Sequence, residues 1–230
     1  METYTVTRTV RETPDVTTIY LLDATGTHAD FRPGQYVTVQ FPDLAAQVPE
    51  GKAYSIASIP SDAELAISVK AIGRYSNRLC SLQPGDTVQL SKPYGYLYAE
   101  SERPLVCIGA GVGMSPLMSI VRSELMRRAD RAVTVLCSNK TPENIVYFDV
   151  LNELDRTHTG LQVTHYITRA PQPHGAHYRS GRIQLQAQPL PDKAFYAVCG
   201  SVAFVAAMYQ QLKALGVADA RIATETFFES

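Results

Sequence analysis

PLVCIGAGVGMSPLMSIVRSELMRRA, residues 104–129, decides the fold of the C-terminal half of the chain. PLVCIG has the length and apolar character of a buried strand, and SPLMSIVRSELMRRA has the apolar spacing of an amphipathic helix. Gly109, Gly111 and Gly113 lie between them, where bare backbone lets a pyrophosphate approach a helix N-terminus. The glycines are evenly spaced, unlike the usual G-x-G-x-x-G, and Pro116 follows in the first turn. A turn that serves packing alone is therefore the alternative interpretation.

The segments that follow repeat the alternation of strand and helix, which is typical of a parallel α/β sheet of the Rossmann type. APQPHGAHYRSG (170–181) interrupts the pattern as an expected irregular loop. The expected strands are AVTVLCS (132–138), LQVTHYIT (161–168), FYAVCG (195–200) and RIATET (221–226). The expected helices are ENIVYFDVLNEL (143–154) and residues 202–215.

The N-terminal half has a different texture, with short β-branched and aromatic runs separated by Gly, Pro and Asp. Such runs predict a six-stranded antiparallel β-barrel with one helical interruption near residues 75–82. The polar stretch AESERP (99–104) separates the two sequence patterns. We therefore expect the β-barrel domain over residues 1–100 and an α/β domain over residues 101–230. The expected barrel strands are 4–10, 17–22, 35–41, 53–58, 65–70 and 86–90.

Composition excludes several classes of function. With 21 basic and 22 acidic residues, the chain has no excess of positive charge that would indicate binding to nucleic acid or to an anionic membrane. No stretch has the length of a membrane span and the N-terminus lacks the apolar run of a signal peptide, so we expect a cytoplasmic protein. Cys80, Cys107, Cys137 and Cys199 are scattered singly, so we expect no metal centre. Any electrons would then travel through an organic cofactor.

GKAYSIAS (51–58) has the residue types that a flavin needs. Lys52 and Tyr54 share a face of a strand, and they offer a cation, an aromatic surface and a neighbouring hydroxyl. In GRYSNRL (73–79), the free N–H groups of a helix start and the Ser76 hydroxyl suit phosphate oxygens. The alternatives are a surface strand with an incidental Tyr and an ordinary helix cap.

Two further segments end strands of the α/β half. Cys199 and Gly200 close one strand at the edge where ligands of parallel sheets collect, although a lone Cys is also a common small core residue. ATETFFES (223–230) places Glu225 beside two Phe residues, which suit either a core plug or a cover over a planar cofactor.

In their order along the chain, these segments resemble the ferredoxin–NADP reductase family. The resemblance covers nearly the whole chain, although Lys52 replaces the family's usual Arg, Lys92 replaces a Gly, and three residues follow Phe227. The matching segments are FRPGQYVTV (31–39), KAYSIAS (52–58), SVKAIGRYSNRL (68–79), LQPGDTVQLSKPYGYLY (82–98), GAGVGMSP (109–116) and CGSVAFVAAMYQQLKALGV (199–217).

The resemblance implies specific roles. Tyr54 would stack on the isoalloxazine of FAD, and Ser55, Cys199 and Glu225 would form the catalytic set. Phe227 or Phe228 would cover the ring. The implied cofactor contacts in the N-terminal half are Lys52, Ala53, Tyr54, Ser55, Ser68, Val69, Lys70, Arg74, Tyr75 and Ser76. Of these, Lys70, Arg74 and Ser76 would hold either the FAD phosphates or the incoming dinucleotide. The implied dinucleotide contacts are Gly109, Ala110, Gly111, Val112, Gly113, Ser138, Lys140, Thr168, Arg169, Cys199 and Gly200, with Phe227 at the ring.

The expected function is an FAD-dependent NAD(P)H reductase that transfers hydride to flavin N5. No acidic residue follows the second α/β strand, and ITRAP resembles a 2'-phosphate clamp, so NADPH is favoured over NADH. Electrons would pass to a separate acceptor, either a ferredoxin, a flavodoxin or an oxygenase component, because no iron–sulfur segment is present. The alternatives are a flavin reductase that releases reduced flavin and a non-catalytic flavin-binding subunit of a larger complex.

Overall fold

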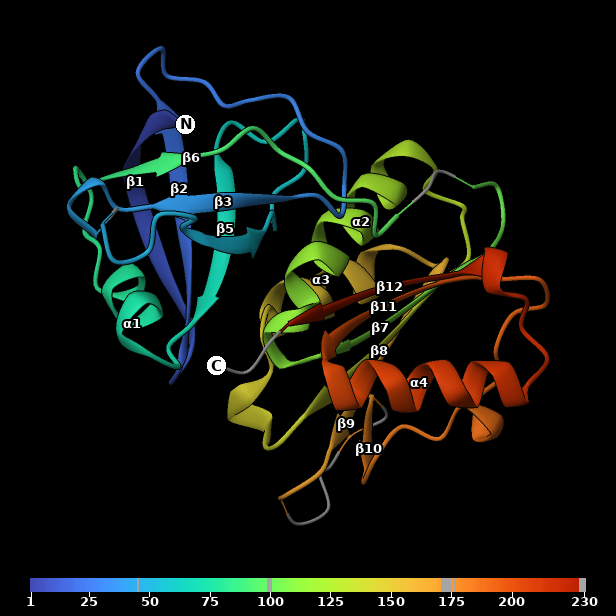
Figure 1. Cartoon of the computed structure of the whole chain (residues 1–230). Coiled ribbons are helices and arrows are strands. Elements are labelled where there is room, and N and C mark those ends of the chain that lie inside the picture. The colour runs from blue at the N-terminus through green and yellow to red at the C-terminus, as the bar shows by residue number, and fades with distance from the viewer. Residues whose placement is uncertain (45, 99–100, 171–174, 176, 228–230) are drawn as a thin grey trace.

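The computed structural model of the chain describes residues 1–230 except 45, 99–100, 171–174, 176 and 228–230. It contains two six-stranded sheets. In Figure 1 the first sheet forms the left half of the molecule, and the second sheet with its helices forms the right half. Among the described residues, no helix is both long and apolar enough to cross a bilayer.

The first sheet is antiparallel and curls into a barrel. Its strand order is β4-β3-β6-β1-β2-β5, and its two edges meet at a bridge between Ile56 and Ile67. The prediction of a six-stranded antiparallel barrel is confirmed, with closure limited to this short contact. The elements are β1 (Glu2–Thr13), β2 (Val16–Asp23), β3 (Tyr36–Gln40), β4 (Lys52–Ser55), β5 (Leu65–Lys70), α1 (Arg74–Cys80) and β6 (Thr87–Leu90).

Strand β5 is buried on both faces, which explains its nearly continuous apolar sequence LAISVK. Leu65, Ile67 and Val69 point into the core of the barrel. Ala66 and Ser68 point the other way, and Ala66 belongs to the core of the second half. The alternation of side chains along a strand thus makes β5 part of both the barrel and the interface.

The second sheet is parallel, with the order β10-β9-β8-β7-β11-β12. Its side chains alternate between two helical layers: Cys107 packs with α2 and α3, and Ile108 packs with α4. This confirms the predicted α/β arrangement. The elements are β7 (Leu105–Ala110), α2 (Met114–Arg127), β8 (Val133–Asn139), α3 (Phe148–Thr157), β9 (Leu161–Ile167), β10 (Tyr178–Ser180), β11 (Phe195–Ser201), α4 (Val202–Ala214) and β12 (Ile222–Phe227).

Two local predictions in this half were wrong. The helix expected from Glu143 begins only at Phe148, because Pro142–Asn144 forms a 3-10 turn and Tyr147 takes a left-handed backbone conformation with φ of 59°. The expected loop over 170–181 contains the short strand β10, which pairs with β9. The expected boundary between residues 100 and 101 lies beside Ala99 and Glu100, which are outside the described residues.

The two halves share a core. Ala57 and Ala66 of the barrel belong to the same apolar cluster as Met118 of α2. At the rim of this contact Arg122 makes two hydrogen bonds to Asp62, at 2.7 and 2.8 Å. Apolar burial and a bidentate ion pair together fix the orientation of the barrel on the sheet.

Candidate active site

The register of the parallel sheet places three predicted site residues side by side. Gly109 of β7 pairs with Cys199 of β11, which pairs in turn with Glu225 of β12. This row lies at the carboxyl end of the strands, the edge where ligands bind in open α/β sheets. Figure 1 shows β12 running toward the barrel, so its last residues reach the boundary between the halves.

A cavity of about 600 Å³ lies at this boundary. Its volume is within the range of roughly 300–1,000 Å³ that is usual for ligand sites. Many of the predicted site residues line it, from both halves of the chain. They are Lys52, Ala53, Tyr54, Ser55, Ser68, Lys70, Arg74, Tyr75, Ser76, Val112, Glu225 and Phe227.

Ser55 and Glu225 connect the two halves inside the cavity. The Ser55 hydroxyl donates a hydrogen bond to Glu225 Oε1 at 2.8 Å, although 170 residues separate the two along the chain. Burial raises the pKa of Glu225, and the hydrogen bond from Ser55 opposes that rise. Burial, with Glu225 nearby, also raises the pKa of the Cys199 thiol well above its usual range, so this sulfur stays protonated. Cys199 pairs in register with Glu225, and a thiol with a raised pKa is a weaker nucleophile.

The aromatic surface of the cavity comes from Tyr54. This side chain is half-buried against the barrel core while it lines the cavity. Burial raises the pKa of its phenol, which therefore stays neutral. A neutral, fixed aromatic ring at the wall of a cavity is the surface that a planar heterocycle needs for stacking.

Cations surround the mouth of the cavity. Among the described residues, neither Lys52 nor Arg74 has an ion-pair partner, so both charges are free for an anionic ligand. Lys70 is 3.4 Å from Asp15 and is partly neutralised. The Ser76 hydroxyl accepts hydrogen bonds from the backbone N–H groups of Ile72 and Gly73, both at 3.0 Å, so it already holds the start of α1.

The glycine-rich turn after β7 combines packing with an open backbone. A Cβ on Gly113 would lie 2.5 Å from the carbonyl oxygen of Cys199, so this glycine allows the close approach of β11. Gly111 has φ of 52°, and nothing lies within 4 Å of the position of its Cβ. The packing interpretation of this turn therefore applies to Gly113, whereas no neighbouring atom accounts for a glycine at position 111, whose backbone is open.

Other predicted residues lie outside the cavity. Ser138, Lys140, Thr168 and Arg169 gather at the carboxyl ends of β8 and β9, where Arg169 N donates to Lys140 O at 2.8 Å. The side chain of Val69 packs in the barrel core. Residues outside the cavity also include Gly109, Ala110, Cys199 and Gly200 at the adjoining ends of β7 and β11, and Gly111 and Gly113 in the 3-10 turn that follows β7. Phe228 lies outside the described residues.

The structure adds cavity residues that sequence reasoning missed, namely Tyr36, Ile72, Ser115 and Thr226, and Gly73 of the expected helix start lines the cavity as well. The position of Tyr36 opposite Ser55 depends on the pairing of β3 with β4, which the sequence does not state. Ser115 carried a readable signal, because a hydroxyl directly after a glycine-rich turn lies in the first turn of the helix.

Comparisons with known proteins agree with this geometry. The family described as "Oxidoreductase NAD-binding domain" matches residues 107–210. The ferredoxin–NAD(P)(+) reductase component of naphthalene 1,2-dioxygenase/salicylate 5-hydroxylase systems of Ralstonia sp is 31% identical over 87% of this chain and 62% of its own length. A flavohemoprotein of Chromobacterium violaceum is 32% identical over 94% of this chain and 58% of its own. The chain thus spans about 60% of the length of these curated relatives.

Solved structures match over the full length of the chain. The flavohem-like FAD/NAD binding domain of nitric oxide dioxygenase from Vibrio cholerae has a TM-score of 0.86 and 28% identity, and the match covers 98% of both chains. A ferredoxin NADP+ reductase from Neisseria gonorrhoeae with bound FAD and NADP has a TM-score of 0.79, again over 98% of both chains, at 22% identity.

The barrel and the parallel sheet, with the cavity between them, have the fold of these solved structures. The chain is similar to a ferredoxin–NAD(P)(+) reductase component and to a flavohem-like FAD/NAD binding domain, in agreement with the resemblance found in the sequence.

Proposed function

We propose that this chain is an FAD-dependent NAD(P)H reductase, with FAD on the barrel and the nicotinamide dinucleotide on the α/β half, divided near residue 100. The observation that carries the proposal is the hydrogen bond between Ser55 and Glu225 inside the cavity. It brings a donor from the barrel and a carboxylate from the parallel sheet to one point beside the aromatic ring of Tyr54. A site of this kind is built from both halves and serves two ligands that must meet.

The residues of the cavity fit FAD. Tyr54 offers the stacking surface, and the unpaired Lys52 and Arg74 offer positive charge for the pyrophosphate. When bound, FAD supplies the hydride acceptor, whereas the protein supplies positioning. Ser55 would orient the reacting edge of the ring through its hydroxyl, and Glu225 would hold that hydroxyl in place.

The residues at the carboxyl edge of the sheet fit a dinucleotide. The open backbone at Gly111 and the start of α2 suit a pyrophosphate. Lys140, Thr168 and Arg169 gather where the adenosine ribose of such a ligand would lie, and with Ser138 they offer positive charge and hydroxyls but no carboxylate. This composition favours a 2'-phosphate, so we assign NADPH as the preferred donor, with NADH as the weaker one.

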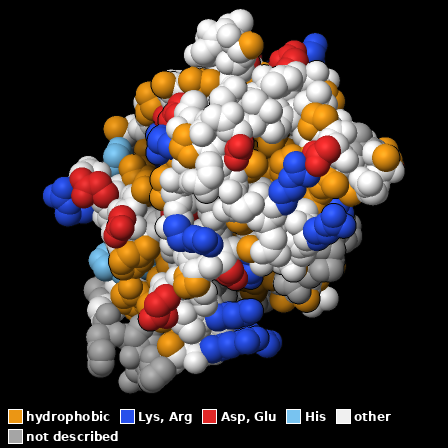
Figure 2. Space-filling view, turned by 90° about the vertical axis from the view of Figure 1, so that its left-hand side faces the viewer, with side chains coloured by type: hydrophobic (Ala, Val, Ile, Leu, Met, Phe, Trp, Pro, Cys, Tyr) orange, Lys and Arg blue, Asp and Glu red, His pale blue; other side chains and the backbone are white. Residues whose placement is uncertain are grey.

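The acceptor that we propose is a separate redox protein, such as a ferredoxin, a flavodoxin or an oxygenase component. The support comes from the relatives whose names describe reductase components of naphthalene dioxygenase systems. On the face in Figure 2, acidic and basic side chains are interspersed, and the net charge of the chain is -1. Docking would therefore depend on local pairing of charges rather than on one strong field.

An absorbance spectrum of the purified chain tests the proposed function. We expect a bound flavin whose visible band is bleached under anaerobic conditions by NADPH, and more slowly by NADH. A protein that binds flavin but is bleached by neither would contradict the proposal. Colourless protein that turns over added flavin would instead identify a flavin reductase that releases its product.

Glu225→Gln is expected to slow flavin reduction by NAD(P)H while flavin stays bound. The amide has nearly the shape of the carboxylate but loses its charge, so the positioning of Ser55 is altered. A rate about 10- to 100-fold lower would be in line with the cost of lost positioning. Stopped-flow absorbance measures this rate. Glu153→Gln, at an exposed position of α3, is the matched control, and a Glu225→Gln rate equal to that of the control would remove Glu225 from the site.

A further inference from the structure

A chain of hydrogen-bonded hydroxyl groups crosses the interface between the two halves. It contains groups from β1, β2 and β5 of the barrel, and from the starts of α2 and α3. Its members are Glu12, Thr18, Ser68, Tyr147 and Ser115. The proposed function gives a role to Ser68 as a cavity residue and uses none of the other four.

The links of the chain are continuous. Thr18 Oγ1 donates to Glu12 Oε1 at 2.7 Å and lies 2.7 Å from Ser68 Oγ. Ser68 Oγ is hydrogen-bonded to the Tyr147 hydroxyl, which also donates to Ser115 Oγ at 3.3 Å. The four hydroxyl residues are 1–6% exposed, so bulk water does not compete along the path.

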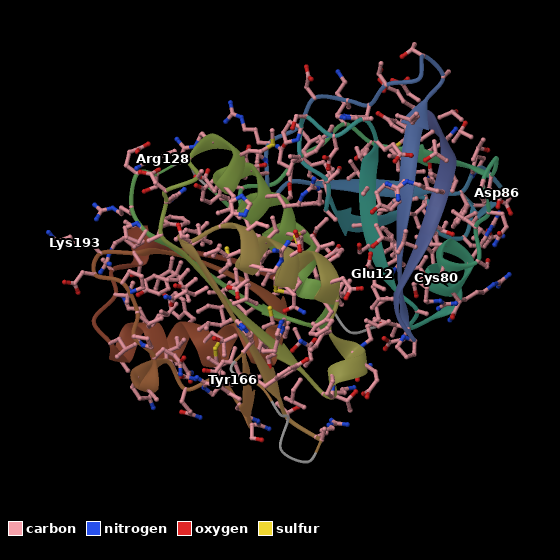
Figure 3. The ribbon with its side chains drawn as sticks, turned by 180° about the vertical axis from the view of Figure 1, so that it is seen from behind. Glu12, Cys80, Asp86, Arg128, Tyr166 and Lys193 are labelled. Atoms are coloured by element: carbon pink, nitrogen blue, oxygen red, sulfur yellow. The ribbon has the colours of Figure 1, made fainter. Side chains whose placement is uncertain are left out.

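The chain connects two cavities. Ser68 and Ser115 line the cavity that we assign to the flavin. Glu12, Thr18 and Tyr147 line a second cavity of about 360 Å³, which is rich in charged side chains. Figure 3, drawn from behind, shows Glu12 on the side of the barrel that faces the α/β half. One end of the chain is therefore in the reaction cavity, and the other is at a polar opening.

The carboxylate sets the direction of the hydrogen bonds. An ionised Glu12 only accepts, so Thr18 donates to it and must accept from Ser68. The hydroxyl proton of Tyr147 is donated to Ser115, so these two residues form a side branch at Ser68. The donors at Ser68 and Thr18 both point toward Glu12, which is the order that lets a proton enter at the reaction cavity through Ser68 and leave at the carboxylate. Burial raises the pKa of Glu12, and this makes the carboxylate a better proton acceptor.

We propose that this chain of hydrogen-bonded side chains conducts a proton. It is the proton that remains in the flavin cavity when the electrons of NAD(P)H leave one at a time. The inference rests on the proposed function. One NAD(P)H delivers a hydride, which is one proton and two electrons. Two one-electron acceptors remove only the electrons, so one proton per NAD(P)H must leave the cavity. It enters at Ser68, Ser68 and Thr18 each pass their own proton onward, and one proton arrives on Glu12.

Two substitutions interrupt the path without touching the cavity. Thr18→Val removes the link between Ser68 and Glu12, with a side chain of nearly equal size. Glu12→Gln keeps an oxygen that accepts from Thr18 but cannot take up a proton. Thr17→Val is the matched control, because Thr17 is an equally buried neighbour whose hydroxyl lies outside the chain. Thr18→Ser restores the hydroxyl.

The experiment reduces the flavin-loaded protein anaerobically with one equivalent of NADPH and mixes it with ferricyanide, a one-electron acceptor. Flavin absorbance and a pH-indicator dye in weak buffer follow reoxidation and proton release together. We expect both to slow by about 100-fold in Thr18→Val and Glu12→Gln, the lower part of the range for a positioned proton-transfer group. Thr17→Val and Thr18→Ser should match the wild type. Flavin content, unfolding midpoint and the rate of reduction by NADPH should be unchanged in all four.

The outcomes separate the two proposals. Proton release at the wild-type rate in Thr18→Val and Glu12→Gln would overturn the proton path while the reductase assignment stands. A wild-type chain that NAD(P)H does not reduce would overturn both. The solvent deuterium isotope effect on reoxidation supplies a further readout. The isotope effect should increase in Thr18→Val and Glu12→Gln and stay constant in Thr17→Val. A purely structural role for the hydroxyls would not produce this difference.

Discussion

Replacing Tyr54 by Ala is expected to raise the dissociation constant of FAD by about 100-fold. Two contributions add: the aromatic pairing, worth about 0.5–1.5 kcal/mol, and the apolar area that the ring covers, worth roughly 1.5–3 kcal/mol. A total near 3 kcal/mol corresponds to about two factors of ten in affinity. Equilibrium dialysis or flavin fluorescence measures the constant directly.

Tyr54→Phe and Tyr209→Ala are the controls for this prediction. Phe keeps the stacking face and should retain most of the affinity, whereas Tyr209 lies on α4, outside the cavity, and its loss should not matter. If Tyr54→Ala bound FAD as tightly as Tyr209→Ala, the ring of Tyr54 would not be the stacking surface, and the placement of FAD in this cavity would fail with it.

Arg131→Met is expected to destabilise the fold by about 3–5 kcal/mol, the usual cost of breaking a buried ion pair. The side chains of Arg131 and Glu124 are 2% and 3% exposed, and they form an ion pair. Arg131 also donates to the carbonyl oxygen of Arg103 at 2.9 Å and to the Tyr98 hydroxyl at 2.8 Å. Its loss would leave Glu124 buried with fewer partners. Chemical denaturation measures the change in unfolding free energy.

The same pair predicts a pH dependence. Burial raises the pKa of Glu124, but hydrogen bonds from Arg127, Tyr98 and Arg131 outweigh burial and hold it below its ordinary value. When the pKa of a carboxyl is lower in the folded than in the unfolded protein, that group stabilises the fold at pH values above its unfolded pKa. This stabilisation is lost as the pH falls through the folded pKa. The acid-induced loss of stability should therefore be smaller in Arg131→Met. Arg156→Met, which breaks an exposed pair with Glu153, should leave the acid profile almost unchanged. Equal profiles for the two variants would contradict this account of Glu124.

The local features of the site could be predicted from the sequence because they depend on short-range patterns. Alternation along one strand placed Lys52 and Tyr54 on one face, and both line the cavity. Val69 was implied as an FAD contact by the resemblance alone; its side chain packs in the barrel core, whereas Ala66 of the same strand packs against the second half. The late start of α3 depends on the left-handed backbone of Tyr147, which no propensity indicates.

Long-range features depended on the resemblance. Nothing local in ATETFFES says that Glu225 pairs in register with Cys199, or that it meets Ser55 of the other half. Strand β10 escaped detection because three residues in a polar loop carry no period, and pairing with β9 alone makes them a strand. Such positions are set by tertiary contacts rather than by the segments themselves.

The 170-residue separation between Ser55 and Glu225 has a consequence for synthesis. A ribosome that adds 5–20 residues per second needs roughly 10 to 30 s to travel from one to the other. A barrel that folds as it emerges would hold its aromatic ring and cations during that interval, while the carboxylate is still missing. On the proposed function, a nascent chain can bind its flavin early, but it begins to consume reducing equivalents only after β12 has joined the sheet.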